Sequence, residues 1–262
     1  GAEQPRLNAE HLLAAALGLK RMELYLQCDR PLGEAERAPL REAVRRRGAR
    51  EPLQHVLGTA EFHWRTFACD RRALVPRPET EQLAEIALEL ARGGASPRVL
   101  DAGTGSGVLA VTLACELDSA GIDATDISAG ALALAAENAA RHGVDGRVRF
   151  AEADLWPPDA PAFDLVVANL PYIPSGELPG LSPEVRHDPA SALDGGPDGL
   201  DAIRALVRGA PAHLRPGGAL LMEIGLGQAD AVAALLEASK FRDISVRPDY
   251  QSIPRFAVGF YG

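Results

Sequence analysis

A chain of 262 residues, 47% hydrophobic and 24% charged, is typical of a globular protein, and its short, charge-interrupted apolar runs exclude a membrane span. Three cysteines without a CxxC pair argue against a disulfide framework or a metal cluster and indicate a reducing cytoplasm. The net charge of −9 is uneven: residues 1–78 hold 14 Lys/Arg and 10 Asp/Glu (+4), and the remainder holds 13 and 26 (−13). So acidic a part is a poor partner for a nucleic-acid backbone, and we expect no stable nucleic-acid binding.

Residues 8–50 are predicted to be helical. The segment NAEHLLAAALG has apolar residues at helical spacing, with Asn8 as the expected N-cap and Gly18 as the stop. GEAERAPLREAVRRRGA forms a second amphipathic stretch. Residues 53–75 lose this period and gain aromatic and β-branched residues, which indicates a short strand pair between two domains. We therefore expect a helical domain at 1–52, a strand-pair linker at 53–78 and a large domain at 79–262.

The large domain alternates strand and helix patterns. PRPETE marks the turn before the helix EQLAEIALELAR, and the alternation then runs through RVLDAG, GVLAVTLACEL, AGIDATD, AGALALAAENAARHG, RVRFAEAD and FDLVVANL. LRPGGALLMEIG predicts a turn and a strand, QADAVAALLEAS a helix and RFAVGFYG a last strand. Such alternation is typical of βαβ units, so the sequence predicts an α/β fold with a mostly parallel sheet.

A glycine-rich turn follows the first of these strands. The segment VLDAGTGSG supplies Asp101, Gly103, Gly105 and Gly107. Glycines there let the backbone turn tightly and approach a ligand, but a plain turn or a dinucleotide site would fit as well. The next strand ends at Asp126, which can accept from ribose hydroxyls, and the third ends near Asp154, which can accept from an adenine amino group. Either carboxylate could instead cap the helix that follows.

The three strand ends together predict a nucleoside cofactor, and S-adenosylmethionine (SAM) is favoured over NAD. The dinucleotide spacing G-x-G-x-x-G would need a glycine where Val108 stands. Asp101, which opens the loop, suits a sulfonium amino acid better than a pyrophosphate. We expect SAM as the cofactor and no metal.

The strand VVAN ends in an unusual corner, Asn169, Leu170, Pro171 and Tyr172. A planar, conjugated NH2 group is a poor nucleophile, but the Asn169 side chain and the Leu170 carbonyl could accept its two hydrogens and orient it. Pro171 biases Leu170 to an extended backbone, and Tyr172 could stack on a flat substrate. We expect these four residues to be catalytic, with adenine, cytosine and glutamine all open as substrates.

Asn-x-Pro-Tyr resembles motif IV of amino-methyltransferases, whose usual form is NPPY; Leu170 replaces the first proline. EFHWRTFACDRRALVPRPETE, VLDAGTGSG, NLPYIP and EVRHDPASALDGGPDGLDAIRAL together resemble the PrmC/HemK family over nearly the whole chain. Members of this family are glutamine N5-methyltransferases that modify the GGQ motif of bacterial peptide chain release factors. They generally begin with one more helix, so we expect this sequence to start later than theirs.

The resemblance implies a Rossmann-like SAM-dependent methyltransferase domain with a mostly parallel seven-stranded sheet, and a small N-terminal helical domain that recognises the substrate. It implies that Arg77 and Glu79 of PRPETE help to close the site. The cofactor-binding residues that it implies are Asp101, Gly103, Thr104, Gly105, Ser106, Gly107, Asp126, Asp154, Leu155 and Asn169.

Two alternatives remain at this stage. The NLPY form also occurs in rRNA adenine dimethyltransferases, so N6-adenine methylation of rRNA or DNA is the alternative activity, although those enzymes usually carry a GPGxG-type loop and lack PRPETE. A SAM-binding regulatory module without catalysis is the other. The charge distribution and the helical N-terminal domain favour a protein substrate, namely class I peptide chain release factors, and a cytoplasmic monomer.

Overall fold

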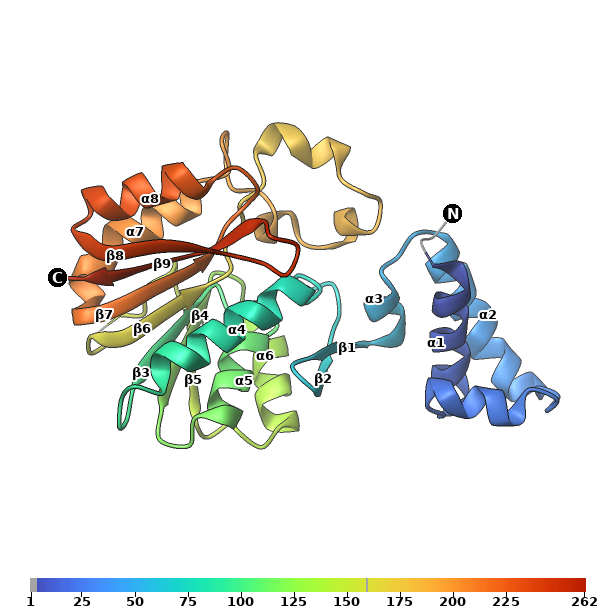
Figure 1. The fold of residues 1–262 in the computed structure, drawn as a ribbon. Coiled ribbons are helices and arrows are strands. Elements are labelled where there is room, and N and C mark those ends of the chain that lie inside the picture. Colours follow the sequence, from blue (N-terminus) through green and yellow to red (C-terminus); the bar gives the residue numbers. More distant parts are fainter. Residues whose placement is uncertain (1–3, 159) are drawn as a thin grey trace.

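The computed structural model describes residues 4–158 and 160–262 (Figure 1). The chain begins with helices that stand apart from the rest of the molecule, at the right of Figure 1. Within the described residues, no helix has both the length and the apolarity needed to cross a membrane. The N-terminal elements are α1 (Pro5–Leu17), the 3-10 helix η1 (Arg21–Gln27), α2 (Glu34–Gly48) and the short α3 (Leu53–Leu57).

Helix α1 starts earlier than its sequence pattern predicts. Its N-cap is Gln4, because Pro5 has the backbone angle that the first helical position requires, so the expected N-cap at Asn8 was wrong. Asn8 lies inside the helix instead, and its Oδ1 accepts a hydrogen bond from Arg47 Nε of α2 at 2.6 Å. The expected stop at Gly18 is confirmed, with φ of 63°.

The predicted strand pair is present and is anchored to the large domain. Strands β1 (Thr59–Phe62) and β2 (Arg65–Ala68) pair antiparallel. Residues 53–57, expected within this pair, form α3 instead, which ends at Gly58 with φ of 72°. The buried Asn138 amide completes β2: Ala68 N donates to its Oδ1 at 2.7 Å, and its Nδ2 donates to Ala68 O at 3.1 Å. The strand pair is therefore fixed against helix α6 (Ala129–Arg141) of the large domain.

The large domain contains a seven-stranded sheet in the order β5-β4-β3-β6-β7-β9-β8, in which β9 runs in the direction opposite to the other six strands. This confirms the predicted mostly parallel α/β fold. The strands are β3 (Arg98–Ala102), β4 (Gly121–Asp126), β5 (Val148–Glu152), β6 (Phe163–Ala168), β7 (Leu214–Glu223), β8 (Phe241–Pro248) and β9 (Pro254–Tyr261).

Helices cover both faces of the sheet, and the sheet separates the hydrophobic core into two layers (Figure 1). One layer contains α4 (Pro78–Ala91), α5 (Val108–Glu116) and α6 (Ala129–Arg141), and the other contains α7 (Asp201–His213) and α8 (Ala229–Ala238). Alternate residues of a strand face opposite layers. In β6, Leu165 packs into the first layer and Val166 into the second.

The order of the strands in the sheet determines where the candidate site lies. Strands β3, β4 and β6 are parallel, so their carboxyl ends meet at one edge, and the chain leaves β3 toward β4 on one side while β6 lies on the other. Ligands of open parallel sheets bind at such a switch point. After β6 the chain forms η2 (Ser175–Gly180), η3 (Val185–His187) and η4 (Ala190–Ala192), which lie between the sheet and the N-terminal helices in Figure 1.

The N-terminal helices contact this segment through Glu184. Its carboxylate accepts from Arg47 Nη2 at 3.1 Å and from Arg50 Nη2 at 2.6 Å. The Arg47 side chain is only 10% exposed, so the carboxylate of Glu184 stabilises a largely buried positive charge.

We predict that Glu184→Ala lowers the free energy of unfolding by about 1–3 kcal/mol, because a buried guanidinium loses its carboxylate. Denaturant unfolding followed by circular dichroism measures this. The matched control is Glu89→Ala, which removes a 65%-exposed carboxylate paired with Arg247 and should cost under about 0.5 kcal/mol. Equal effects of the two substitutions would contradict the structural role of the Glu184 contact.

Candidate active site

A cavity of about 1050 Å³, including its open mouth, lies at the carboxyl edge of the sheet. Most of the residues predicted to bind a cofactor or to act in catalysis line it: Gly103, Thr104, Gly105, Ser106, Asp126, Asp154, Leu155, Asn169, Leu170 and Pro171. The structure thus brings together three loops that are distant in the sequence. Asp101 and Gly107 lie outside this lining, and Tyr172 faces a second cavity.

The glycine-rich loop has a backbone that other residues would strain. Gly103, Gly105 and Gly107 have φ of 74°, 56° and 80°. A Cβ atom on Gly103 would lie 2.7 Å from Leu170 Cδ2, and one on Gly107 would lie 2.9 Å from the Cβ of Ala135. The loop therefore closes against both the catalytic corner and α6 in a way that only glycine permits.

Asp101 holds this loop from behind. It is fully buried, and its Oδ2 accepts from Thr104 Oγ1 at 2.7 Å and from Ala110 N at 3.0 Å. Its Oδ1 has no partner among the described residues, and burial raises the pKa of this carboxyl to about 6. The residue connects the loop to the start of α5 and does not reach the cavity wall.

Asp126 is hydrogen-bonded to two neighbouring turns. Its Oδ1 accepts from Ser128 N and its Oδ2 from Gly105 N, each at 2.9 Å, so it orders the turn before α6 and the glycine-rich loop. A carboxylate has about four acceptor sites, so capacity for two ribose hydroxyls remains on the cavity side.

Asp154 and Leu155, which are predicted to bind adenine, both line the cavity. Asp154 is exposed and lies two residues beyond β5. Leu155 has φ of 63°, a left-handed conformation that is unfavourable for leucine, and its carbonyl accepts from Thr125 Oγ1 at 2.6 Å. The buried threonine thus keeps the Leu155 side chain in the wall of the cavity. These features fit an adenosine-containing cofactor.

A second cavity of about 740 Å³ adjoins the first. Asn169 and Leu170 line both cavities, whereas Tyr172 lines only the second and Pro171 only the first. The NLPY corner therefore stands where a substrate in the second cavity would meet a cofactor in the first. Burial raises the pKa of the Tyr172 hydroxyl to about 12, so the ring is neutral and available for stacking.

Two functional candidates were missed from the sequence. The Asn169 Nδ2 group donates to Thr80 Oγ1 at 2.9 Å, and Thr80 Oγ1 donates to Glu223 Oε2 at 2.9 Å. Thr80 lies within PRPETE, where only Arg77 and Glu79 were singled out. Glu223 ends β7, beside β6, so the strand-end argument that selected Asp126 would also have found it.

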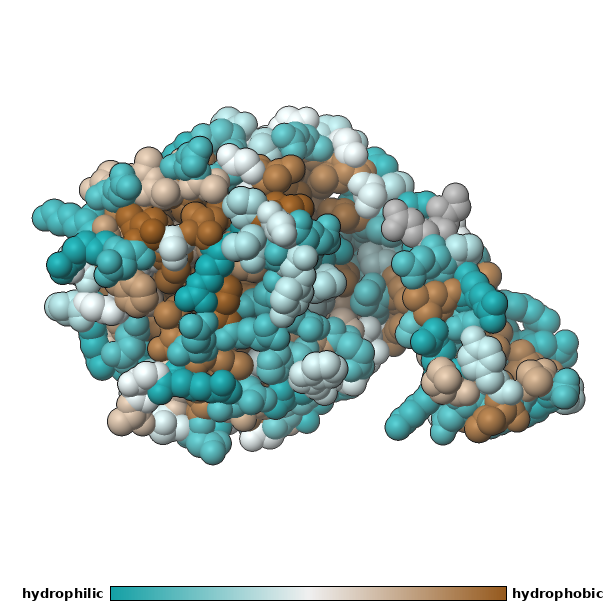
Figure 2. All heavy atoms as spheres, in the orientation of Figure 1, coloured by the Kyte–Doolittle hydropathy of each residue, from teal (hydrophilic) through white to brown (hydrophobic). Residues whose placement is uncertain are grey.

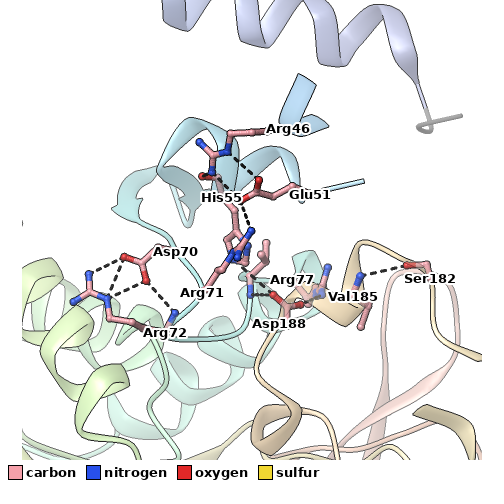
Figure 3. Close-up of polar contacts among 11 residues, drawn as sticks. Arg46, Glu51, His55, Asp70, Arg71, Arg72, Arg77, Ser182, Val185 and Asp188 are labelled. Atoms are coloured by element: carbon pink, nitrogen blue, oxygen red, sulfur yellow. Dashed lines mark hydrogen bonds and ion pairs between the residues drawn. The ribbon is translucent and has the colours of Figure 1, made fainter. Parts of the chain in front are cut away.

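Arg77 connects the PRPETE loop to the segment after β6 (Figure 3). Its Nη2 donates to Asp188 Oδ2 at 2.7 Å, and Val75 N donates to Asp188 Oδ1 at 3.3 Å. Asp188 is buried, which raises the pKa of its carboxyl to about 6. Arg77 lines both cavities and Glu79 only the second, and their role in closing the site stays a prediction.

A histidine and a second carboxylate complete this junction (Figure 3). His55 Nε2 lies 3.8 Å from Asp188 Oδ1, and burial lowers the pKa of the ring, so it is neutral at pH 7. Glu51 pairs with Arg46 at 2.8 Å and Arg71 at 3.1 Å, and the hydrogen bond from Arg46 lowers its pKa to about 2. The junction between the N-terminal helices and the catalytic loops is therefore polar and largely charge-paired.

Known proteins resemble this chain over its full length. The family model "PrmC N-terminal domain" matches residues 1–58, and the family model "Methyltransferase domain" matches residues 99–187. A release factor glutamine methyltransferase of Geobacter sulfurreducens is 46% identical over 264 residues, which cover 100% of this chain and 92% of that protein. One from Deinococcus radiodurans is 44% identical over 256 residues, covering 98% of this chain and 91% of that protein.

Solved structures share the fold of the large domain. A 16S rRNA methyltransferase of T. thermophilus, in complex with AdoMet and guanosine, matches with a TM-score of 0.55 at 18% identity. The match covers 78% of this chain and 50% of that one.

We predict that Asp126→Ala weakens SAM binding by at least tenfold, since two hydrogen bonds to a charged group are worth about 1.5–3 kcal/mol each. Isothermal titration calorimetry measures the dissociation constant. Asp145→Ala, an exposed position in the same domain with the same change in charge, is the control and should bind SAM as the wild type does. Unchanged affinity of Asp126→Ala, or tight binding of NAD in place of SAM, would overturn the assignment of the cavity.

Proposed function

This chain belongs to the family of release factor glutamine methyltransferases, and we propose that the junction of its two cavities is the place where methyl transfer occurs. The enzyme transfers a methyl group from SAM to the side-chain amide of a release factor glutamine. The observation that carries the assignment of the site is that Asn169 and Leu170 line both cavities. No other part of the NLPY corner does so.

Orientation and electrostatics account for the catalytic contribution of the chain. When bound, SAM supplies an electrophilic methyl group on a sulfonium centre. The Asn169 Oδ1 atom and the Leu170 carbonyl would each accept one hydrogen of the glutamine NH2, which fixes the nitrogen and increases its electron density. Asn169 Nδ2 donates one hydrogen to Thr80, which holds the NH2 side of this amide toward Thr80 and leaves the oxygen as its acceptor for substrate.

The walls of the substrate cavity suit a side chain that enters from a protein loop. Leu181, Val185 and Leu193 of the segment after β6 contribute apolar surface, and Tyr172 contributes a flat ring. The site residues are proposed as a set: the glycine-rich loop for the amino acid part of SAM, Asp126 for the ribose, and Asp154 with Leu155 for adenine.

The proposed partner is a class I peptide chain release factor, modified at the N5 nitrogen of the glutamine in its GGQ motif. Flanking glycines would let the substrate backbone come close enough for this side chain to reach the methyl group. Residues 1–52 are proposed to dock a distal surface of the release factor, and the enzyme is proposed to act as a cytoplasmic monomer. The comparisons give the alternative of adenine methylation no support.

Incubation with labelled SAM tests this function directly. In separate reactions with a release factor, rRNA and duplex DNA, we predict label in the release factor alone, at a single glutamine identified by mass spectrometry. Replacing that glutamine in the release factor should abolish labelling. Label that enters only the nucleic acids would refute glutamine as the substrate.

The same assay tests the catalytic corner. Asn169→Ala should lower kcat by about 10²- to 10³-fold because the substrate amide loses one oriented acceptor, while SAM affinity stays near that of the wild type. A variant that methylates at the wild-type rate would show that Asn169 is structural.

A further inference from the structure

Asn169 is the first member of a chain of hydrogen bonds that runs into the core. Asn169 Nδ2 donates to Thr80 Oγ1, and Thr80 Oγ1 donates to Glu223 Oε2, each at 2.9 Å. Thr80 is 4% exposed and Glu223 is 2% exposed. The three side chains come from the corner after β6, the first turn of α4 and the end of β7, and α4 packs against both strands. We call Thr80 and Glu223 the orienting pair.

The direction of these hydrogen bonds is fixed by chemistry. An ionised carboxylate only accepts, and a hydroxyl has a single proton. Once the Thr80 hydroxyl donates its hydrogen bond to Glu223, Thr80 Oγ1 can only accept a further one. Asn169 must then be the donor, and its donor group is the NH2. A flipped Asn169 would bring its carbonyl oxygen against the lone pairs of Thr80 Oγ1, leaving two buried acceptors face to face.

We propose that Thr80 and Glu223 are positioning residues that hold the Asn169 amide with its oxygen toward the substrate. This inference rests on the proposed function, because it concerns how the same site selects its substrate. Within the described part of the chain nothing donates to Asn169 Oδ1, which leaves it for the glutamine NH2. The opposite orientation would present a donor to a donor, so the orienting pair makes the site specific for an NH2 group.

Glu223 also holds the second side chain of the substrate cavity. The Tyr172 hydroxyl donates to Glu223 Oε1 at 3.4 Å. One buried carboxylate thus orients Asn169 through Thr80 and positions the Tyr172 ring directly. The position of β7 next to β6 makes this possible, since the ends of both strands lie at the same edge.

The arrangement has a pH dependence of defined sign. The groups that face Glu223 are Thr80 and Glu79 from α4, Tyr172 from the corner after β6, and Arg255 from β9. Burial raises the pKa of the Glu223 carboxyl to about 7. A protonated Glu223 can donate to Thr80, which frees the threonine proton for Asn169 Oδ1 and permits the flipped amide. The ionised form is therefore the active one, and kcat should rise with pH through about 7.

The first test compares Thr80→Val, which removes only the hydroxyl, with Thr80→Ser, which keeps it. Thr80→Val should lower kcat for release factor methylation by about 10- to 100-fold, with KM and SAM affinity within about twofold of the wild type. Thr80→Ser should retain most of the wild-type kcat. Thr112→Val is the matched control, because Thr112 is equally buried in α5 but its Oγ1 has no partner among the described residues; it should leave kcat unchanged.

Two further readouts separate orientation from a general loss of structure. In NMR spectra, the Asn169 side-chain NH2 should be protected from hydrogen exchange in the wild type and in Thr80→Ser, and exposed in Thr80→Val. Glu223→Gln removes the titrating carboxyl, so it should lower kcat and abolish the rise in kcat near pH 7.

Wild-type kcat in Thr80→Val, or an unchanged pH profile in Glu223→Gln, would overturn the orienting role while the wild-type enzyme still labels the release factor. If the wild type itself fails to label the release factor, the proposed function is wrong instead. A protected Asn169 NH2 in Thr80→Val would likewise refute the hydrogen-bond chain.

Discussion

The contact between Gly103 and Leu170 sets the geometry of the active site. A Cβ on Gly103 would come within 2.7 Å of Leu170 Cδ2, so the cofactor loop and the catalytic corner are as close as side chains allow. Leu170 is 5% exposed and belongs to the core layer that also contains Ala102 and Leu155. This packing explains how a leucine can replace the first proline of the NPPY motif. Burial of the Leu170 side chain restrains the backbone of the corner, as the ring of the first proline does in NPPY.

That close contact also explains why the two cavities share walls. With the loops after β3 and β6 in contact, Asn169 and Leu170 line both spaces, which is where we propose that the substrate meets the methyl donor. Asp101 supports one loop from behind, and the orienting pair supports the other. Both supports contain a buried carboxyl whose pKa is raised by burial, to about 6 in Asp101 and about 7 in Glu223. The carboxyl groups that support the site are therefore buried behind the residues that face the ligands.

The sequence predicted the parts of the site that follow from strand ends. Parallel strands bring their carboxyl ends to one edge, so Asp126, Asp154 and Asn169 could be placed together before the structure was known. Sequence patterns cannot show which side chains meet across long separations, and Thr80 and Glu223 are 143 residues apart. They also could not show that Asp101 is fully buried and does not line the cavity. The smaller errors concern local secondary structure, where neighbouring residues favour different outcomes. Pro5 starts α1 ahead of Asn8, the expected N-cap, and residues 53–57, expected within the strand pair, form a helix.

The segment after β6 connects the N-terminal helices with the substrate cavity. It is held by Arg47 and Arg50 at Glu184 and by Arg77 at Asp188, the last of which is drawn in Figure 3. Leu181 and Leu193 of this segment line the cavity. Figure 2 shows hydrophilic side chains on much of the face in view of both parts, with hydrophobic ones among them where the parts meet. A release factor that docks on the helices would thus lie against the same segment that surrounds its glutamine.

A crystal structure of the enzyme with S-adenosylhomocysteine and a peptide that contains the GGQ motif tests most directly whether the NLPY corner holds the glutamine amide. We predict that the glutamine amide nitrogen lies within hydrogen-bond distance, about 3 Å, of both Asn169 Oδ1 and the Leu170 carbonyl, and points at the sulfur atom. A glutamine amide bound away from the NLPY corner, or an Asn169 that presents its NH2 group to the substrate, would contradict it.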